Sequence, residues 1–424
     1  MVSSNAPDPA YINLEQRLNR LPQGAPPSDS LYNILKILVT PQEAELVSLL
    51  PVKPFTVQQA AQNWKKPLLE TQNILENLAS RAFLLDYEQP DGSMMYVLPP
   101  PMAGFFEFSL MRVRSDIDQK ALAEEYHQYC TVEGDFMHAL FDNQTQVGRI
   151  FVNEPLLPSV EVLDYERASD VIRTSNHRGI ALCYCRHKAQ MLGSACNAPL
   201  DICMTFNGPA ESLIRHGHAR SAEVPEMLDH LQRAYDHNLV QFGENVQHGV
   251  NFICNCCGCC CEALVAARRF SSLRPIYTSN FIPEIDSSLC SGCGKCAQIC
   301  PVDAMTLVSG HDPLQARRMS AHLQKDLCLG CGVCVRVCSR KAIQLSPRSQ
   351  KVITPYNTTH RLVMMAIEKG TFQDLIFDNR VLWSQRSLSA LLGAFLNLPP
   401  IKQALASRQV KSRFFEALVK KNKL

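Results

Sequence analysis

The sequence predicts an α+β protein of several domains. Its 424 residues are enough for about three domains of ordinary size. Hydrophobic residues make up 46% of the chain and charged residues 19%, a composition that allows sizeable cores and argues against wholesale disorder. Helix-capping signals early in the chain give way to mixed strand and helix patterns, and a cysteine-rich repeat follows. We therefore expect helical ends on either side of a mixed α/β centre.

The first part of the chain divides into a lead-in and a small helical domain. Residues 1–30 are rich in Pro, Ser and Asn, and we expect a loose lead-in there. The domain that follows is expected over 31–112. Within it, residues 40–43 form the capping box Thr-Pro-Gln-Glu, with Pro at the first helical position. Residues 56–59 repeat this device with Thr and Gln, and Pro67 opens a third helix.

A β-hairpin is predicted directly after these three helices. Apolar residues over 83–87 and 94–98 flank a turn with the sequence Pro-Asp-Gly at 90–92. Three helices followed by a hairpin resemble a winged helix, which invites a DNA-binding interpretation. Residues 31–100, however, hold five Lys and Arg against seven Asp and Glu, whereas a duplex-binding face needs several cations to neutralise phosphates. We expect a structural or protein-docking domain and no nucleic-acid partner.

A cysteine-rich α/β domain is expected over residues 113–280. Its pattern mixes short strands and helices: helices are predicted at 165–175 and 223–237, and buried strands at 180–185 and 250–254.

The 19 cysteines are clustered, and only Cys130 precedes residue 180. The start of the chain lacks a basic segment followed by an apolar one, so no signal peptide is expected. The best apolar candidate, 388–398, is shorter than the ~18–20 residues that span a bilayer. We therefore expect a cytoplasmic protein, in which thiols stay reduced and clustered cysteines indicate metal ligation or redox chemistry before disulfides.

The strongest signal is a pair of Cys-x2-Cys-x2-Cys-x3-Cys runs within 281–350. This is the two-cluster signature in which the fourth cysteine of each run serves the other cluster, because it lies on a following turn that faces that cluster. The predicted ligands of one 4Fe-4S cluster are Cys290, Cys293, Cys296 and Cys338, and those of the other are Cys328, Cys331, Cys334 and Cys300.

Residues 281–347 resemble a bacterial dicluster ferredoxin domain. Two departures are visible: Ser339 stands where a Pro usually follows the fourth cysteine, and the spacer 301–327 is 27 residues long. Neither removes a ligand. Two zinc sites of four thiolates each are the minor alternative.

Ten further cysteines lie upstream in two groups. They are Cys183, Cys185, Cys196, Cys203, Cys254, Cys256, Cys257, Cys259, Cys260 and Cys261. Thiols this dense would be an oxidation hazard in a reducing cell unless they bind metal, so we expect all ten at metal centres. Cys130 stands alone and is expected to be a small buried hydrophobe.

In each upstream group we expect a strand to deliver the cysteines to a loop or helix. Residues 262–267 predict a helix that begins at the second run, whose N-terminus would stabilise thiolates. Residues 186–188, Arg-His-Lys, add positive charge beside the first group. Because consecutive strand residues point to opposite faces, Cys256 and Cys257 should serve different sites, unless one of them is no ligand.

Ten thiols fit two more 4Fe-4S clusters with two cysteines left over, one cluster plus a redox dithiol, or one larger cluster. We therefore expect one or two further iron–sulfur clusters. Zinc is less expected, because the neighbouring ferredoxin-like repeat needs a redox partner.

The order of these motifs over most of the chain resembles a group of bacterial and archaeal iron–sulfur proteins described as four-iron four-sulfur dicluster-domain proteins. The resemblance implies electron transfer, either as a carrier or as an oxidoreductase subunit that works with redox partner proteins. A variant of this hypothesis is thiol or disulfide reduction at a cluster-adjacent dithiol. The alternative is a redox-sensing transcriptional regulator that reads DNA with the winged helix.

Other cofactor and catalytic motifs are missing from the sequence. No Gly-x-Gly-x-x-Gly follows a strand and no Walker-type Gly-Lys-Ser/Thr occurs, so no nucleotide cofactor is expected. No Ser-His-Asp order or His-Glu-x-x-His motif is present, and we assign no catalytic residue.

The last segment, 351–424, is expected to be helical. From residue 401 it holds seven Lys and Arg against Glu416 alone. It is either a basic amphipathic helix that contacts a membrane surface or an acidic partner, or a last helix packed on the body with a solvated basic face, which we favour.

Overall fold

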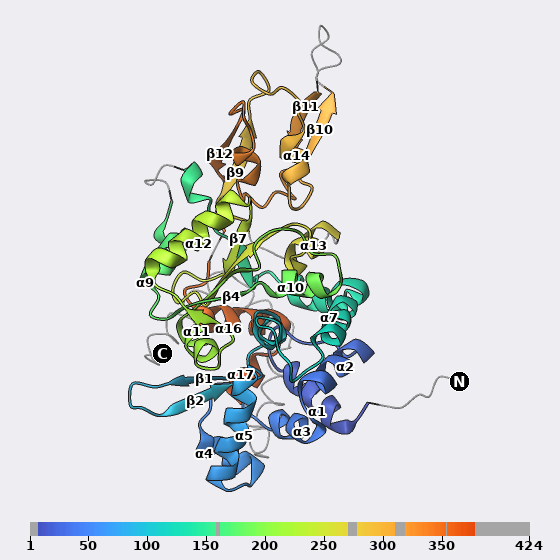
Figure 1. Ribbon diagram of the computed structural model, residues 1–424, viewed down its shortest axis with the longest axis vertical. Coiled ribbons are helices and arrows are strands. Elements are labelled where there is room, and N and C mark those ends of the chain that lie inside the picture. Colours follow the sequence, from blue (N-terminus) through green and yellow to red (C-terminus); the bar gives the residue numbers. More distant parts are fainter. Residues whose placement is uncertain (1–6, 158–161, 270–277, 310–318, 353, 378–424) are drawn as a thin grey trace, which may run out of the picture. The chain divides into compact units, whose positions relative to one another are not determined.

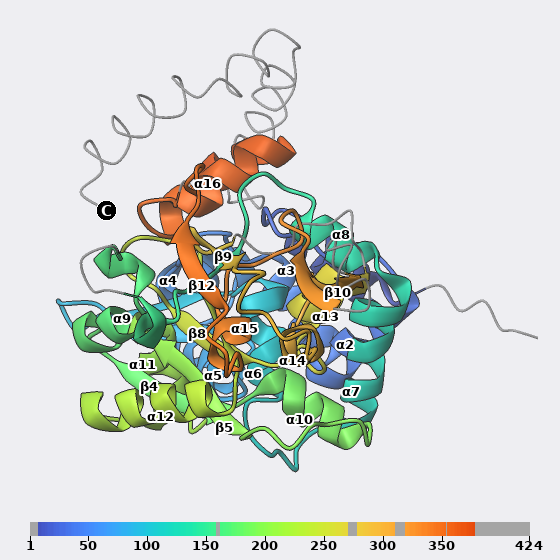
Figure 2. The ribbon, with the colours of Figure 1, turned by 90° about the horizontal axis from the view of Figure 1, so that it is seen from above.

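The computed structural model describes residues 7–157, 162–269, 278–309, 319–352 and 354–377 (Figures 1 and 2). The chain forms two compact units. Among the described residues, unit 1 contains 7–109, 114–145 and 357–377, whereas unit 2 contains Leu110–Val113 and the described part of Gln146–Tyr356. Residues 114–145, which the sequence led us to place with the cysteine-rich part, therefore belong to unit 1.

Unit 1 is mainly helical, with one hairpin. Both predicted capping boxes are present, with Thr40 and Thr56 as the N-cap residues, and the predicted hairpin forms from two antiparallel strands. Its elements are α1 (Pro9–Leu18), α2 (Asp29–Leu38), α3 (Pro41–Ser48), α4 (Val57–Trp64), α5 (Leu68–Ser80), β1 (Leu85–Glu88), β2 (Met94–Val97), α6 (Phe106–Ser109), α7 (Gln119–His127), α8 (Asp135–Phe141), α16 (Thr358–Lys369) and α17 (Phe372–Ile376).

Helix α1 corrects the expectation of a loose lead-in. The Asp8 side chain accepts a hydrogen bond from the Ala10 N–H and caps the helix, which begins at Pro9. Leu14 and Leu18 are fully buried, and α1 packs against α3. Apolar residues four positions apart give the helix one face to bury, and this burial outweighs the turn-forming composition around it.

Unit 2 is built on a six-stranded sheet with the order β3-β7-β8-β5-β4-β6, in which all neighbours are antiparallel. Helix α12 covers β4 and β5, with α9 beside it (Figures 1 and 2). The strands are β3 (Gly148–Ile150), β4 (Arg178–Leu182), β5 (Asp201–Phe206), β6 (Arg220–Ser221), β7 (Val240–Glu244) and β8 (Phe252–Cys256). The helices are α9 (Ala168–Thr174), α10 (Tyr184–Met191), α11 (Asn207–Arg215), α12 (Val224–Asp236) and α13 (Glu262–Arg269).

The predicted strand 180–185 ends early. Strand β4 stops at Leu182, Cys183 precedes the helix, and Cys185 lies on α10 rather than on a strand. Lys, Ala, Gln and Met, which follow within α10, are strong helix formers and explain why the chain turns helical here.

The cysteine repeat forms two small two-stranded sheets, in the upper part of Figure 1. Strand β9 (Phe281–Ile285) pairs with β12 (Ile343–Pro347), and β10 (Met305–Ser309) pairs with β11 (Met319–Leu323). The short helices α14 (Lys295–Ile299) and α15 (Val333–Arg336) follow the two cysteine loops. Because the first strand pairs with the last, the two halves of the repeat come together.

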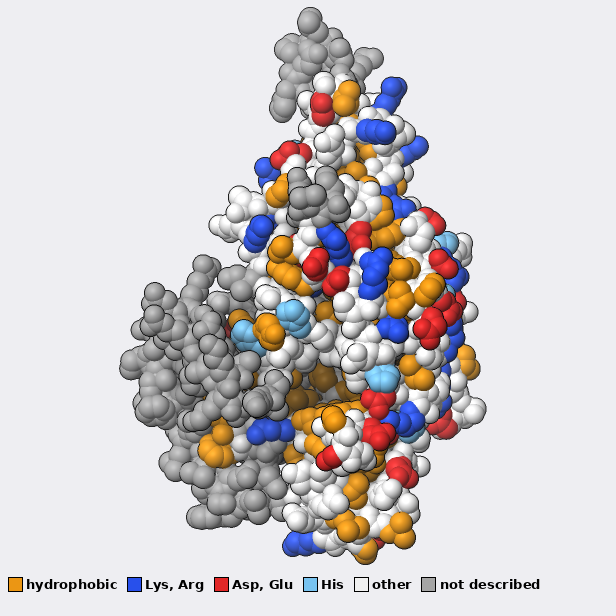
Figure 3. Space-filling model, turned by 90° about the vertical axis from the view of Figure 1, so that its left-hand side faces the viewer, with side chains coloured by type: hydrophobic (Ala, Val, Ile, Leu, Met, Phe, Trp, Pro, Cys, Tyr) orange, Lys and Arg blue, Asp and Glu red, His pale blue; other side chains and the backbone are white. Residues whose placement is uncertain are grey.

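Among the residues that the structure describes, no helix has both the length and the apolar character to cross a bilayer. The basic segment from residue 401 lies outside the described residues. On the face shown in Figure 3, basic and acidic side chains intermingle, as expected of a net charge of +2.

Candidate metal centres

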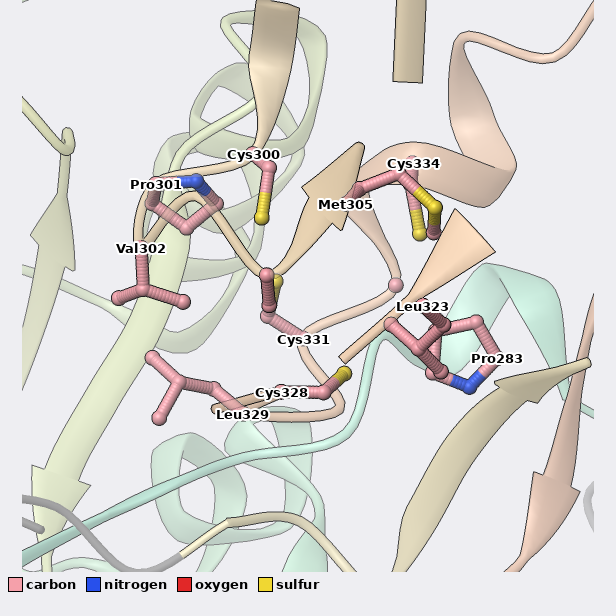
Figure 4. A pocket seen from close by; sticks show the side chains of 12 residues that line it. Pro283, Cys300, Pro301, Val302, Met305, Leu323, Cys328, Leu329, Cys331 and Cys334 are labelled. Atoms are coloured by element: carbon pink, nitrogen blue, oxygen red, sulfur yellow. The ribbon is translucent and has the colours of Figure 1, made fainter. Parts of the chain in front are cut away.

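The fourth cysteine of the first run lies with three cysteines of the second. The Cys300, Cys328, Cys331 and Cys334 side chains line one cavity, and their sulfurs approach it from different sides (Figure 4). The rest of its wall is almost entirely apolar and includes Met305. Four thiols around an apolar cavity are the donor set that a 4Fe-4S cluster requires, and the crossed assignment predicts this grouping.

Three of the other four cysteines of the repeat belong to one apolar cluster, which also includes Cys334 and Cys300 from the first set. Cys290 and Cys296 are buried in it, and Cys338 from the second run packs against it. Cys293 is exposed, at the surface of the same loop. Helices α14 and α15 are in contact, which brings the end of the second run to the first loop.

Backbone N–H groups point at two of these sulfurs. Gly330 N–H donates to Cys328 Sγ over 3.4 Å, and Ala321 N–H donates to Cys290 Sγ over 3.5 Å. Such bonds favour the thiolate form and tune an iron–sulfur cluster. Gly330 has a φ of +70°, and a Cβ there would overlap the Phe281 carbonyl oxygen, so only glycine fits.

Burial opposes ionisation of the cavity thiols. Burial raises the pKa of Cys331 to about 12 and also raises that of Cys328, despite the N–H donors beside them. Metal binding at this site must therefore displace protons, and binding will couple to pH.

Four of the upstream cysteines form a compact group. Cys196, Cys257, Cys259 and Cys260, here called the four-thiol group, place all their sulfurs within 4.8 Å of one another. Cys196 Sγ lies 3.6 Å from Cys257 Sγ and 3.9 Å from Cys260 Sγ, and Cys259 and Cys260 are 3.7 Å apart.

The other six, here called the six-thiol row, are neighbours of one another, and each neighbouring pair shifts the pKa values of its own members. The neighbouring pairs are Cys183–Cys203, Cys203–Cys254, Cys254–Cys256, Cys256–Cys261 and Cys261–Cys185. The row draws on α10, β5, β8 and the start of α13, so it joins residues far apart in the sequence.

Strand β8 explains how one cysteine run serves both groups. Cys254 and Cys256 lie on one face of the strand, and Asn255 lies on the other, fully buried. The Asn255 amide donates to Ile202 O over 2.7 Å and accepts from Gln241 over 3.2 Å, which anchors the strand. The strand ends at Cys256 and the chain turns, so Cys257 joins the four-thiol group. Cys256 and Cys257 thus lie in different groups, but the turn separates them, not the alternation of a strand.

Buried cations stand beside both groups. The Arg186 guanidinium is 1% exposed, donates to Asn255 O over 2.8 Å and to Pro199 O, and lies beside Cys183 and Cys257. Lys188 on α10 forms an ion pair with Glu262 on α13, each side chain being 5% exposed. The sequence showed Arg186 and Lys188, but it gave no sign that Glu262 is the partner of Lys188, because no local pattern links residues so far apart.

The pKa values of neighbouring thiols differ widely within each group. A hydrogen bond from Cys260, together with the Arg186 charge, lowers the pKa of Cys257 to about 4. Hydrogen bonds from Cys203 and Cys256 lower the pKa of Cys254 to about 6, and those from Cys185 and Cys256 lower that of Cys261. Each group thus holds thiolate character next to protonated neighbours, which suits soft metal ions.

One comparison with known proteins gave a match. A family model described as 4Fe-4S dicluster domain matches residues 289–343, the two cysteine runs of the repeat. Neither the curated proteins nor the solved structures include a significant match to the chain. The match and the clustered cysteines indicate iron–sulfur cofactors, and the upstream region is consistent with this.

Crossed ligation can be tested by combining substitutions. We expect Cys300→Ala added to a Cys328→Ala, Cys331→Ala background to cause no further loss of iron, because all three residues would serve one cluster. Added to a Cys290→Ala, Cys293→Ala background, it should disturb the second cluster as well. Iron content and electron paramagnetic resonance of anaerobic protein measure both. Cys338→Ala is the control, with the opposite pattern; the reverse result for Cys300→Ala would show that each run serves its own cluster.

The buried ion pair gives a second prediction. Glu262→Gln should destabilise unit 2 by about 3–5 kcal/mol, because it leaves the Lys188 ammonium buried without its carboxylate. The double variant Lys188→Met, Glu262→Leu should recover most of this loss, since both charges are gone. Urea titration under anaerobic conditions, followed by visible absorbance, measures the shift. Equal loss in the single and double variants would mean that side-chain shape, not charge pairing, matters here.

Proposed function

We propose that this chain is an iron–sulfur electron-transfer protein in which the dicluster repeat exchanges electrons with a second, thiolate-bound centre upstream. In this proposal the two sets of four cysteines in the repeat each hold a 4Fe-4S cluster. The upstream cysteines hold one or two further metal centres. Bound clusters of this kind supply one-electron transfer, and the protein supplies their ligands, their spacing and their exclusion from water.

The observation that carries the proposal is a contact between the two cysteine regions inside unit 2. A Cβ placed on Gly258 would lie 2.7 Å from Pro301 Cα and 2.8 Å from Pro301 O, so the two backbones touch. Gly258 lies between Cys257 and Cys259, and Pro301 directly follows Cys300, which lines the cavity of Figure 4. Only a short path of packed backbone therefore separates the four-thiol group from the second cluster site.

Two pairs of charges lie across the same boundary. Arg336, in the helix that carries Cys334, lies 3.7 Å from Asp236 and has its guanidinium 5.4 Å from the Tyr235 ring centre. Arg268 on α13 lies 3.8 Å from Asp303. Partly exposed pairs such as these add little stability, about 0–1 kcal/mol each, but they mark two places where the repeat contacts α12 and α13.

Partner proteins enter this proposal as donor and acceptor. Within the repeat, whose eight cysteines are all described, Cys293 is the exposed cysteine, so its loop is the natural entry point for electrons from outside. The upstream centre is the other end of the path. A reaction at that centre, such as reduction of a disulfide, would make the chain an oxidoreductase component rather than a carrier.

Metal content and coupled transfer test the function. Anaerobically purified protein should hold more than eight iron atoms per chain, since the repeat accounts for only eight of the 19 cysteines. In a Cys185→Ser, Cys256→Ser variant, dithionite should still reduce the repeat, but electron transfer coupled to a partner should stop. Unchanged coupled transfer would show that the six-thiol row is structural and that the chain is a ferredoxin on an elaborate scaffold.

The Gly258–Pro301 contact yields a separate prediction. Gly258→Val should push the two loops apart and slow electron exchange between the repeat and the upstream centre, while metal content stays the same. Flash reduction followed by absorbance measures the exchange. Gly208→Val is the matched control, because a Cβ at Gly208 meets nothing within 4 Å. If both variants exchanged electrons at the parental rate, the contact would not be the route.

A further inference from the structure

The four-thiol group has the dimensions of a site for one metal ion. The measured Sγ–Sγ distances are 3.6, 3.7 and 3.9 Å, and all four sulfurs lie within 4.8 Å of one another. A tetrahedral ion with metal–sulfur bonds of about 2.3 Å has its sulfurs about 3.8 Å apart. The observed spacing matches this tetrahedron. It is also far longer than the ~2.05 Å of a disulfide, so these are four separate thiols.

A 4Fe-4S cluster needs a wider spacing between its four ligand sulfurs. Each thiolate binds a different iron corner of the cube from outside, so the four sulfurs stand farther apart than around a single ion. The ferredoxin-type cysteines of the same chain provide the comparison. All eight are among the described residues, and within the described part of the chain only the four-thiol group brings three or more ligand atoms within 4.8 Å of one another. The chain therefore contains two kinds of thiol site with different sizes.

We propose that Cys196, Cys257, Cys259 and Cys260 bind one divalent ion, Zn²⁺ or Fe²⁺, as a mononuclear tetrathiolate site. Binding releases the thiol protons and leaves a centre with two net negative charges. The site carries no inorganic sulfide. This proposal does not depend on the electron-transfer role. A zinc ion would stabilise the loop that contacts Pro301, whereas an iron ion would add a redox centre there.

The surroundings fit a doubly negative centre. Arg186 is 1% exposed and lies against Cys257, and its Nε has no hydrogen-bond partner although it is buried. A guanidinium with a free donor beside a thiolate compensates charge and can donate to sulfur. Because Arg186 also lies beside Cys183 and Cys203, it stands at the junction with the six-thiol row.

The division leaves the six-thiol row as the place for an upstream iron–sulfur centre. All six of its cysteines are described, and no three of their sulfurs lie within 4.8 Å of one another. The two groups interleave in the sequence, since Cys196 lies between Cys185 and Cys203, and Cys261 directly follows Cys260. Each cysteine nevertheless belongs to only one of the two groups, so a variant can remove a ligand from one group and leave the other complete.

The first experiment uses the unmodified, anaerobically purified chain. Metal analysis and X-ray absorption should show one ion with about four sulfurs at about 2.3 Å and no neighbouring metal. The zinc edge reports this directly if the ion is zinc. If it is iron, Mössbauer spectra should contain one mononuclear high-spin site in addition to the clusters. Absence of both a zinc tetrathiolate and a mononuclear iron site would overturn the proposal.

The second experiment compares Cys259→Ser and Cys196→Ser with Cys130→Ala, a cysteine of unit 1, as the control. Each four-thiol variant should lose one metal equivalent per chain and no acid-labile sulfide, and the control should lose neither. Loss of about four iron together with four sulfide would mean a 4Fe-4S cluster, and no loss at all would mean no metal site; either result refutes the proposal. Neither refuting result touches the test of electron transfer, which rests on Cys185 and Cys256.

Discussion

Strand β8, in the middle of the six-stranded sheet, is the constraint on which both upstream thiol groups depend. It is hydrogen-bonded to β7 on one side and to β5 on the other, and the buried Asn255 anchors it further. A strand held on both sides cannot slip by one residue without moving every side chain to the opposite face. The run of six cysteines at 254–261 therefore begins at a fixed position, and the turn that follows the strand places Gly258 against Pro301.

Negative charge is the main cost of bringing so many thiols together. Thiolates near one another repel, and burial strengthens the repulsion by removing water. Two features compensate this charge: the buried guanidinium of Arg186, and backbone N–H groups that donate to Cys290 and Cys328. Burial also keeps the pKa of Cys331 high, so its thiol stays protonated in the absence of metal. Metal binding and folding of unit 2 should therefore support each other.

Local sequence patterns were sufficient to predict much of unit 1, but they failed for elements whose formation depends on packing against other parts of the chain. The capping boxes at Thr40 and Thr56 and the hairpin at 90–92 could be predicted because each is a short pattern of side chains and turn residues. Helix α1 was missed because its stability comes from burial against α3, a contact that composition does not show. Strand β4 was predicted too long, since apolar residues alone do not mark where helix formers take over.

The same division holds for the candidate sites. The sequence by itself determined the dicluster repeat, because a cluster loop wraps its ligands within a few residues and the spacing between cysteines records this. It also determined that ten more cysteines gather upstream. Only the tertiary structure decided how these ten divide into four and six, and that Lys188 meets Glu262. Such neighbours follow from the order of strands in the sheet, which long-range packing sets and no local pattern encodes.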